Sequence, residues 1–272
     1  MRLRRLSIVF SDHLANISAV RVVKRDPLIM RRVRDAETVV INGEGSIHDG
    51  RPSSRSLLAI AAVATQSGKP VHLVNTTRAG LGPADFRVLR GLDRIVVREP
   101  VSSRYLKAHV LPHELGADAA WTFLQEVAPA LRNAGPCVGS TDRILVTGGA
   151  VQTSSRLRAA LHAVTGEIWY LRVDAADERH LAALEHLDLS GVIDAVSECS
   201  GRPERLLPHI REFGHVLSGR HHLNLFAYYL GIPVTVLCGN THKNEGTREG
   251  FEAAGDDIFR LARKNGLEEI CS

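Results

Sequence analysis

The chain has 272 residues, of which 44% are hydrophobic, so it is long enough to form two domains with cores of ordinary size. Its net charge of +4 is local, because residues 1–40 carry nine Lys or Arg against four Asp or Glu, and we expect these charges to form a solvated face. The sequence has no signal-peptide core, membrane span, nucleic-acid-binding motif or cysteine pair at zinc-site spacing, so we expect a cytoplasmic protein with free thiols, no nucleic-acid partner and no bound metal.

Apolar runs and helical periodicities alternate along the first half of the chain. This alternation is typical of a parallel sheet with crossover helices, so the first half predicts a Rossmann-like α/β domain. The expected strands are residues 6–10, 38–41, 71–75 and 94–97, and the expected helical segments are residues 29–34, 54–67, 83–92 and 102–107.

A polar turn that contains glycine follows the second of these strands. It carries Asn42, Gly43, Glu44, Gly45 and His48. Glycines let a backbone approach a ligand, and successive N–H groups in such a turn can hold an anion. The spacing is neither that of a dinucleotide fingerprint nor that of a P-loop, so NAD and Walker-type ATP binding are disfavoured and no cofactor is expected. Taken alone, the stretch fits a tight turn without a ligand equally well.

His113 and Glu114 begin a stretch similar to the HExxH motif of zinc enzymes. The motif requires a second histidine close to Asp118, and the stretch lacks helical periodicity. We therefore expect no metal there.

Residues 124–142 lose the periodicity and accumulate Pro, Gly and Ser, which indicates a linker between two domains, residues 1–130 and 141–272. The second domain repeats the alternation of strands and helices and is expected to be doubly wound. Its expected strands are residues 144–146, 168–173, 192–196 and 214–217, and its expected helices are residues 154–164, 177–187 and 203–213. Gly148 and Gly149 follow the first of these strands, where ligands of open α/β sheets bind.

The segment 214–243 has the pattern of strand, turn, helix, strand and polar loop. Arg220, His221 and His222 open its helix, where unpaired backbone N–H groups and the macrodipole favour anions. Arginine adds a planar set of donors for phosphate or carboxylate, and histidine can carry a proton near neutral pH. The alternative is that Arg220 caps a neighbouring helix and that the two histidines are structural.

Three stretches together resemble the polysaccharide pyruvyl transferase family. The family has an Arg-x-His at a helix start, a Gly-x-Pro after that helix and a lysine after the next strand, which here are Arg220-His221-His222, Gly231-Ile232-Pro233 and Lys243. Its glycine-rich loop and its Arg-Asp/Glu-x-x-Ser segment correspond to Asn42-Gly43-Glu44-Gly45 and to Arg98-Glu99-Pro100-Val101-Ser102. The matches occur in the family's order, which is more specific than any one of them alone.

The resemblance implies two Rossmann-like doubly wound domains that face a central cleft, as in GT-B glycosyltransferases. Residues 1–130 would form the acceptor side and residues 141–272 the anionic donor side. The implied reaction moves a pyruvyl (carboxyvinyl) group from phosphoenolpyruvate to a sugar hydroxyl of a glycan or glycan precursor and forms a pyruvate ketal. The implied partners are therefore phosphoenolpyruvate and a saccharide acceptor, free or lipid-linked, and peripheral membrane contact is left open.

In that reaction we expect His222 to donate the proton, Arg220 and Arg98 to hold the anion, and Lys243 to act as a third cation. Glu44 or His48 would act as the base for the acceptor hydroxyl. The other expected substrate contacts are Asn42, Gly43, Gly45, Gly148, Gly149 and His221. Two alternatives stay open: a GT-B glycosyltransferase that uses a nucleotide sugar, and a non-catalytic protein that binds sugar phosphates.

Overall fold

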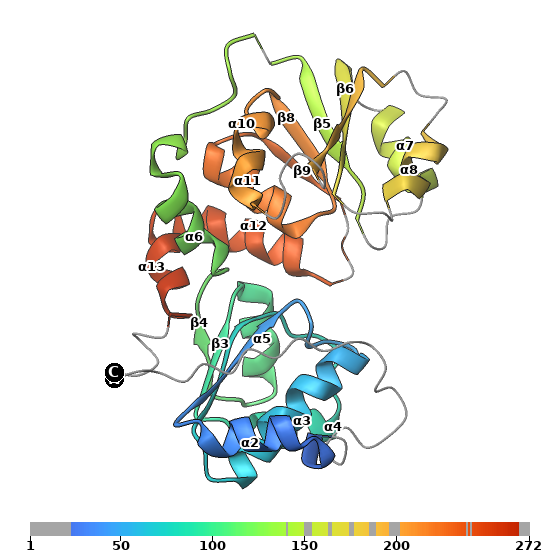
Figure 1. Ribbon diagram of the computed structural model, residues 1–272. Coiled ribbons are helices and arrows are strands. Elements are labelled where there is room, and N and C mark those ends of the chain that lie inside the picture. Colours follow the sequence, from blue (N-terminus) through green and yellow to red (C-terminus); the bar gives the residue numbers. More distant parts are fainter. Residues whose placement is uncertain are drawn as a thin grey trace. The chain divides into compact units, whose positions relative to one another are not determined.

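The structure is a computed structural model of the chain, and it describes residues 23–139, 141–149, 154–162, 165–173, 177–184, 189–195, 202–237, 239 and 241–266. Contacts group these residues into two compact units (Figure 1). The first unit runs up to Ala119 and takes up the chain again from Glu252, and the second unit is Ala120–Phe251. The strand expected at residues 6–10 lies outside the described residues.

A four-stranded parallel sheet organises the first unit, and its strands follow one another in chain order, β1-β2-β3-β4. The strands are β1 (Val39–Glu44), β2 (Val71–Thr76), β3 (Arg94–Val97) and β4 (Glu114–Leu115). The helices are α2 (Pro27–Asp35), α3 (Pro52–Gln66), α4 (Pro83–Leu89), α5 (Pro100–Ala108) and α13 (Asp257–Arg263). Because the strands all point the same way, the residues that follow them gather at one edge of the sheet.

The local sequence explains why these helices begin where they do. A proline occupies the first helical position of α2, α3, α4 and α5, where an N–H would have no helical partner and the fixed φ suits the helix. Asp26 caps α2 by accepting hydrogen bonds from the N–H groups of Leu28 and Ile29, and the Glu99 carboxylate accepts one from the N–H of Ser102. The apolar faces of α2, α3, α4 and α5 then pack with the strands into one core.

The C-terminal helix α13 belongs to the first unit, although residues 141–272 were expected to form the second domain. The side chain of Asn265, just after α13, donates to the carbonyl of Ala117 over 2.7 Å and accepts from the N–H of Asn75 over 2.8 Å. These bonds attach the end of the chain to the residues that follow β2 and β4. No local pattern in the sequence indicates such a return.

A five-stranded parallel sheet organises the second unit, with the strand order β7-β6-β5-β8-β9. The strands are β5 (Arg143–Thr147), β6 (Glu167–Arg172), β7 (Gly191–Asp194), β8 (His215–Ser218) and β9 (Val234–Val236). The helical elements are α6 (Ala120–Val127), η2 (Pro129–Leu131), α7 (Ser154–His162), α8 (Glu178–Ala183), η4 (Pro203–Arg205), α10 (Leu206–Ile210), α11 (His221–Leu230) and α12 (Lys243–Ala254). The last residues of α12, from Glu252 on, are grouped with the first unit. The chain winds from β5 to β7 and then continues on the other side of β5, so the strand order reverses between β5 and β8.

Helices lie on both sides of this second sheet. In Figure 1 α7 and α8 lie beside β6, whereas α10 and α11 lie beside β8. The side chains of β5 alternate accordingly: Ile144 and Val146 form a core with Leu157 and Leu161 of α7, and Leu145 between them is buried outside that core. A strand that is covered on both faces has a continuous apolar sequence, which is why β5 was recognisable.

The segment expected to be a linker, residues 124–142, is attached to the second unit. Helix α6 reaches into it, and the N–H groups of Asn133 and Gly135 donate to the carbonyl groups of Tyr229 and Leu230 over 2.9 and 2.8 Å. Its Pro and Gly residues therefore mark a segment that packs along the end of α11.

Other elements also differ from the expectation. The described part of the first sheet shows no reversal of strand order, so double winding is observed in the second unit and not in the first. The helix expected at residues 203–213 is divided into η4 and the short α10. Helix α12 was not predicted, because Gly246 and Gly250 lower its helix propensity.

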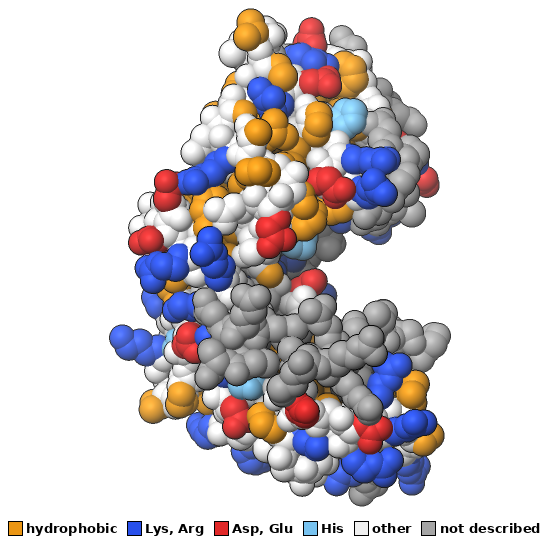
Figure 2. Space-filling model, turned by 60° about the vertical axis from the view of Figure 1, so that its left-hand side comes forward, with side chains coloured by type: hydrophobic (Ala, Val, Ile, Leu, Met, Phe, Trp, Pro, Cys, Tyr) orange, Lys and Arg blue, Asp and Glu red, His pale blue; other side chains and the backbone are white. Residues whose placement is uncertain are grey.

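Charged side chains of both signs lie on the face of the molecule shown in Figure 2. Lys and Arg lie interspersed with Asp and Glu there. On α2, the exposed Arg31 and Arg34 approach the carboxylate of Asp35 to 3.7 and 3.8 Å. This part of the basic stretch is therefore a solvated helix face of mixed charge. None of the helices in the described ranges is both long and apolar enough to cross a membrane.

Gly231 ends α11 in the left-handed conformation, with φ at 75° and its N–H bonded back to the carbonyls of Ala227 and Tyr228. We expect Gly231→Ala to lower the free energy of unfolding by about 1 kcal/mol, because a Cβ is disfavoured at this φ. Gly231→Asn is the matched control, since asparagine also has a Cβ but tolerates the left-handed conformation better. Both tryptophans, Trp121 and Trp169, lie in the second unit, so urea unfolding followed by tryptophan fluorescence measures the effect. Equal losses in the two variants would contradict this explanation.

Candidate functional site

The reversal of strand order in the second unit brings glycine backbones together. Gly148 and Gly149 follow β5, and Gly219 follows β8, its neighbour in the sheet. A Cβ added to Gly149 would lie 2.9 Å from the carbonyl oxygen of Gly219, which is closer than such atoms approach one another. Glycine is therefore required for this contact, and the position is the one where open α/β sheets bind ligands.

Arg220 follows these glycines, and a buried carboxylate holds its guanidinium in place. Nη2 of Arg220 donates to Oδ1 of Asp177 over 2.7 Å, and the Asp177 side chain is fully buried whereas that of Arg220 is 24% exposed. Oδ2 of Asp177 accepts from the N–H of Val173 over 2.8 Å. The N–H of Arg220 donates to the Ser218 hydroxyl over 2.9 Å. Arg220 is thus a positioned and partly exposed cation at the start of α11.

Tyr170 links the same carboxylate to the glycines. Its hydroxyl donates to Oδ1 of Asp177 over 3.2 Å and accepts from the N–H of Gly148 over 3.3 Å. Burial and the negative charge of Asp177 raise the pKa of Tyr170 well above its ordinary value. The hydroxyl therefore stays protonated at neutral pH and keeps its donor, so one network runs from Arg220 through Asp177 and Tyr170 to Gly148.

His221 and His222 form the first turn of α11 but differ in exposure. His221 is buried, with 6% of its surface exposed, whereas His222 is exposed. Their rings meet edge to face with 5.1 Å between the centroids. The unpaired backbone N–H groups of the first turn of α11 and the positive end of its macrodipole lie at this same end of the helix. His222 is therefore the histidine that a ligand can reach, and His221 packs behind it.

Helix α12 begins beside the same glycines. Its first residue is Lys243, and the amide of the buried Asn244 donates to the carbonyls of Gly219 and Leu237 over 3.1 and 3.4 Å. These bonds fix the first turn of α12 against the end of β8. A lysine and a second helix start thereby join the group around Arg220.

Sequence reasoning missed several residues of this group. They are Tyr170, Asp177, Asn244 and also His180, which is buried and lies against Gly148. Asp177 comes shortly after β6, as Arg220 does after β8, so an acidic residue at a strand end was a usable signal. Asp177 and Arg220 meet because β6 and β8 flank β5 in the sheet. The sequence does not show this strand order.

In the first unit the expected glycine turn is partly strand. β1 continues to Glu44, which pairs with Thr76, so the assignment of Asn42, Gly43 and Glu44 to a turn was wrong. The amide of Asn42 donates to the exposed Glu44 carboxylate over 3.4 Å, and Gly43 lies against the side chain of Thr76. Asn42 and Glu44 are polar, but their backbones still pair with Val74 and Thr76 of β2, so the strand extends to Glu44.

His48 lies in the turn beyond Gly45, which is half-buried. Its Nδ1 is 2.9 Å from Oδ2 of Asp49, and the imidazole is fully buried. A carboxylate on Nδ1 fixes the orientation of the ring, as it does for histidines that act as general bases.

Arg98 follows β3 and is buried with a partner. Its Nη1 donates to Oδ2 of Asp118 over 2.7 Å and its Nε donates to the Thr77 hydroxyl over 2.9 Å, and both side chains of the ion pair are 2% exposed. The pair joins the residues that follow β2, β3 and β4. A contact between Arg98 and a ligand anion stays a prediction.

The predicted residues thus form a group within each unit. In the second unit they are Gly148, Gly149, Arg220, His221, His222 and Lys243, and in the first unit Asn42, Gly43, Glu44, Gly45, His48 and Arg98 lie along the edge where the strands end. The group in the second unit combines two cations, two helix starts and an exposed histidine. Such a group can hold a small anion and transfer a proton.

We expect Asp177→Ala to lower the free energy of unfolding of the second unit by about 3 kcal/mol, because it removes the buried partner of Arg220 and of the Tyr170 hydroxyl. Glu178→Ala is the matched control: its carboxylate, next in the chain, is 66% exposed and lies 3.2 Å from Arg172. An exposed pair of this kind contributes less than about 1 kcal/mol. Urea unfolding by tryptophan fluorescence tests both, and similar losses would show that the buried network is unimportant for stability.

The comparisons with known proteins agree with the resemblance seen in the sequence. The family model described as polysaccharide pyruvyl transferase matches residues 10–238, a range that holds the predicted residues of both units except Lys243. Comparison with curated proteins gives no match. Since the family model covers most of the chain, the resemblance is confirmed. The chain belongs to the polysaccharide pyruvyl transferase family, and it is therefore a transferase with a role in pyruvyl transfer to a saccharide acceptor.

Proposed function

We propose that the protein transfers the carboxyvinyl group of phosphoenolpyruvate to a sugar hydroxyl of a glycan or glycan precursor and forms a pyruvate ketal. The family match supports pyruvyl transfer. The observation that favours this donor is the pair of Arg220 and Asp177, which holds a partly exposed guanidinium where the strand order reverses. Phosphoenolpyruvate carries a phosphate and a carboxylate, and a site with Arg220, Lys243 and two helix starts suits such a compact anion.

The proposed reaction accounts for every atom. The methylene carbon of phosphoenolpyruvate takes up a proton and becomes the methyl group of the ketal. One hydroxyl of the acceptor sugar adds to the neighbouring carbon, and a second hydroxyl of the same sugar displaces the phosphate as its C–O bond breaks. Of the two hydroxyl protons, one replaces the proton delivered to the methylene carbon and the other leaves with inorganic phosphate.

The residues of the second unit suit the donor half of this reaction. His222 is exposed on the first turn of α11, so we assign it the proton that goes to the methylene carbon. Arg220 and Lys243 hold the phosphate and carboxylate and stabilise the charge on the departing phosphate, and the backbone of Gly148 and Gly149 lines the same position. His221 packs against His222 and positions its ring.

The residues of the first unit suit the acceptor half. Glu44 is exposed and can take a hydroxyl proton directly, whereas His48 is oriented by Asp49 but buried, so both stay candidates for the base. Asn42, Gly43 and Gly45 adjoin Glu44. The buried pairing of Arg98 with Asp118 favours a positioning role for Arg98 over the anion contact that was expected. A division of this kind, with the acceptor on the first unit and the donor on the second, is the GT-B-like arrangement.

Arg220 and His222 lie at the start of the same helix, but we expect their replacement to affect different steps, donor binding and turnover. Arg220→Ala should weaken the binding of phosphoenolpyruvate, because the clamp is lost. His222→Ala should bind it normally and turn over about 10² to 10⁴ times more slowly, the usual contribution of a general acid. A calorimetric titration measures binding, and phosphate release in the presence of a panel of saccharides measures turnover.

The exposed Arg205 and the half-buried His209 of the second unit serve as matched controls. Arg205→Ala on η4 and His209→Ala on α10 remove the same side-chain types away from the site and should leave binding and turnover unchanged. Normal turnover of His222→Ala would refute the proton-donor assignment. A wild-type protein that binds nucleoside diphosphates and ignores phosphoenolpyruvate would instead be a glycosyltransferase that uses a nucleotide sugar.

A further inference from the structure

The loop that follows β2 carries a buried cation. Arg78 has no exposed surface, and its Nε, Nη1 and Nη2 atoms have no hydrogen-bond partner among the residues that the structure describes. Burial lowers the pKa of Arg78 to about 9, although the charges of Asp85 and Tyr105 act in the opposite direction. The guanidinium therefore stays protonated at neutral pH. A buried charge without a partner is strongly unfavourable, so this side chain points to a missing anion.

Two residues near Arg78 in the chain or across a β-bridge also carry buried polar atoms. Thr76 Oγ1 and His48 Nε2 lack a hydrogen-bond partner among the described residues. Thr76 lies two positions before Arg78, and His48 forms a β-bridge with Ala79, the residue after it. The three side chains of Thr76, Arg78 and His48 thus hold five buried polar atoms without such a partner, whereas buried polar groups in proteins are normally paired.

The backbone of the same loop, in contrast, is held by hydrogen bonds at several points. The N–H of Thr77 donates to the carbonyl of Glu44 over 2.9 Å, and the N–H of Arg78 donates to the Ser102 hydroxyl over 2.7 Å. These bonds attach the loop to β1 on one side and to α5 on the other. The side chains around Arg78 are therefore presented by a fixed backbone, as in a built ligand site.

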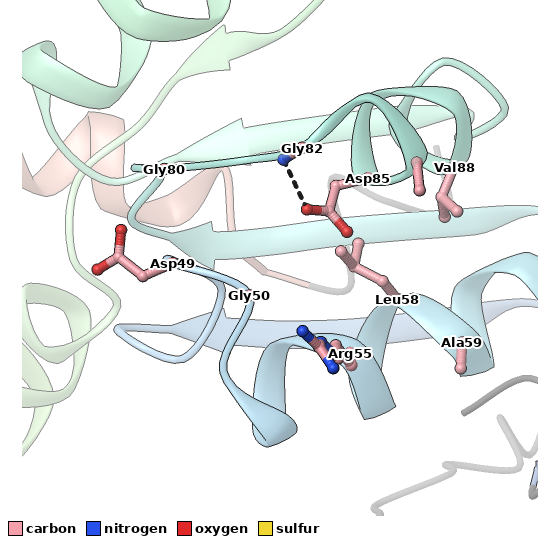
Figure 3. A pocket seen from close by; sticks show the side chains of 10 residues that line it. Asp49, Gly50, Arg55, Leu58, Ala59, Gly80, Gly82, Asp85 and Val88 are labelled. Carbon is pink, nitrogen blue, oxygen red and sulfur yellow. Dashed lines mark hydrogen bonds between the residues drawn. The ribbon is translucent and has the colours of Figure 1, made fainter. Parts of the chain in front are cut away.

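A pocket of about 570 Å³ opens beside this loop, between α3 and α4 (Figure 3). Gly80 and Gly82 of the loop form part of its wall, whereas the fully buried Arg78, two residues before Gly80, is not among the lining residues. Asp85, whose charge acts on Arg78, lines the pocket and accepts from the N–H of Gly82 over 2.9 Å. The rest of the lining combines the polar Asp49 and Arg55 with apolar side chains, among them Leu58, Ala59 and Val88.

We propose that this pocket and loop bind the acceptor saccharide, and that an anionic substituent on that saccharide, a phosphate or a carboxylate, pairs with Arg78. The inference rests on the proposed function, because it defines the class of the acceptor. The planar guanidinium matches both anions bidentately. Carboxylate and guanidinium groups in the pocket suit sugar hydroxyls, and the apolar walls suit the C–H face of a sugar ring.

The test measures binding in the Arg220→Ala protein, because the proposed donor site would otherwise take up phosphate as well. Glucose 1-phosphate, glucuronate and glucose are titrated at constant ionic strength and followed by calorimetry and thermal unfolding. At least one of the two anions should bind, and glucose should bind more weakly. No turnover is involved, so the result does not depend on whether phosphoenolpyruvate is the donor.

Two variants with opposite expected effects on the affinity for the anionic sugars test whether the anion binds at Arg78. Added to the same protein, Arg78→Met should weaken binding by about tenfold or more, which corresponds to about 1.4 kcal/mol per tenfold. Asp85→Asn should strengthen binding, because it removes a neighbouring negative charge and retains an oxygen that can accept from Gly82. Arg87→Met, an exposed arginine on α4, is the matched control and should change nothing.

Each outcome decides for or against the proposal. A response to glucose 1-phosphate alone identifies a phosphate as the partner of Arg78, and a response to glucuronate alone identifies a carboxylate. Equal binding of all three sugars, no binding of either anion, or unchanged anion binding in Arg78→Met overturns the proposal. Should Arg78→Met fail to fold, Asp85→Asn decides, since unchanged or weaker anion binding in that variant contradicts a site at Arg78.

Discussion

The hydrogen-bonded ion pair between Arg220 and the fully buried Asp177 is the contact on which the site of the second unit depends. A buried carboxylate needs several donors, and Asp177 has the Arg220 guanidinium, the Tyr170 hydroxyl and the N–H of Val173. Tyr170 lies in β6 and Val173 directly follows that strand, whereas Arg220 follows β8. The carboxylate therefore sets the direction of the guanidinium and, through Tyr170, the place of Gly148 at the end of β5.

Two arginines at strand ends of the first unit show how different the roles of one residue type can be. Arg98 has Asp118 and Thr77 as partners and is satisfied by its own chain. Arg78 is equally buried and has no such partner among the described residues. Desolvation disfavours both charges, so the first is a structural ion pair, whereas the second is the residue for which we propose an anionic ligand. The same contrast explains why motif position alone is a weak guide to which arginine contacts substrate.

The family and the two sheets together define what kind of chemistry the chain supports. The sites of both units lie where parallel strands end, which is a property of the fold. The polar groups there differ between the units. The second unit presents cations, helix starts and an exposed histidine, which suit a compact anionic donor. The first unit presents a carboxylate, a histidine oriented by Asp49 and a pocket lined by both polar and apolar side chains, which suit a saccharide.

The sequence by itself determined the α/β class, most strand positions and the family, because periodicity, glycine placement and short motifs depend on neighbours along the chain. It also placed Arg220 and His222 at a helix start. Only the tertiary structure decided that Asp177 pairs with Arg220, that α13 returns to the first unit, and that Arg98 is paired and Arg78 is not. These features depend on strand order and on contacts between distant segments. Local pattern carries no information about them, since many strand orders are compatible with the same succession of strands and helices.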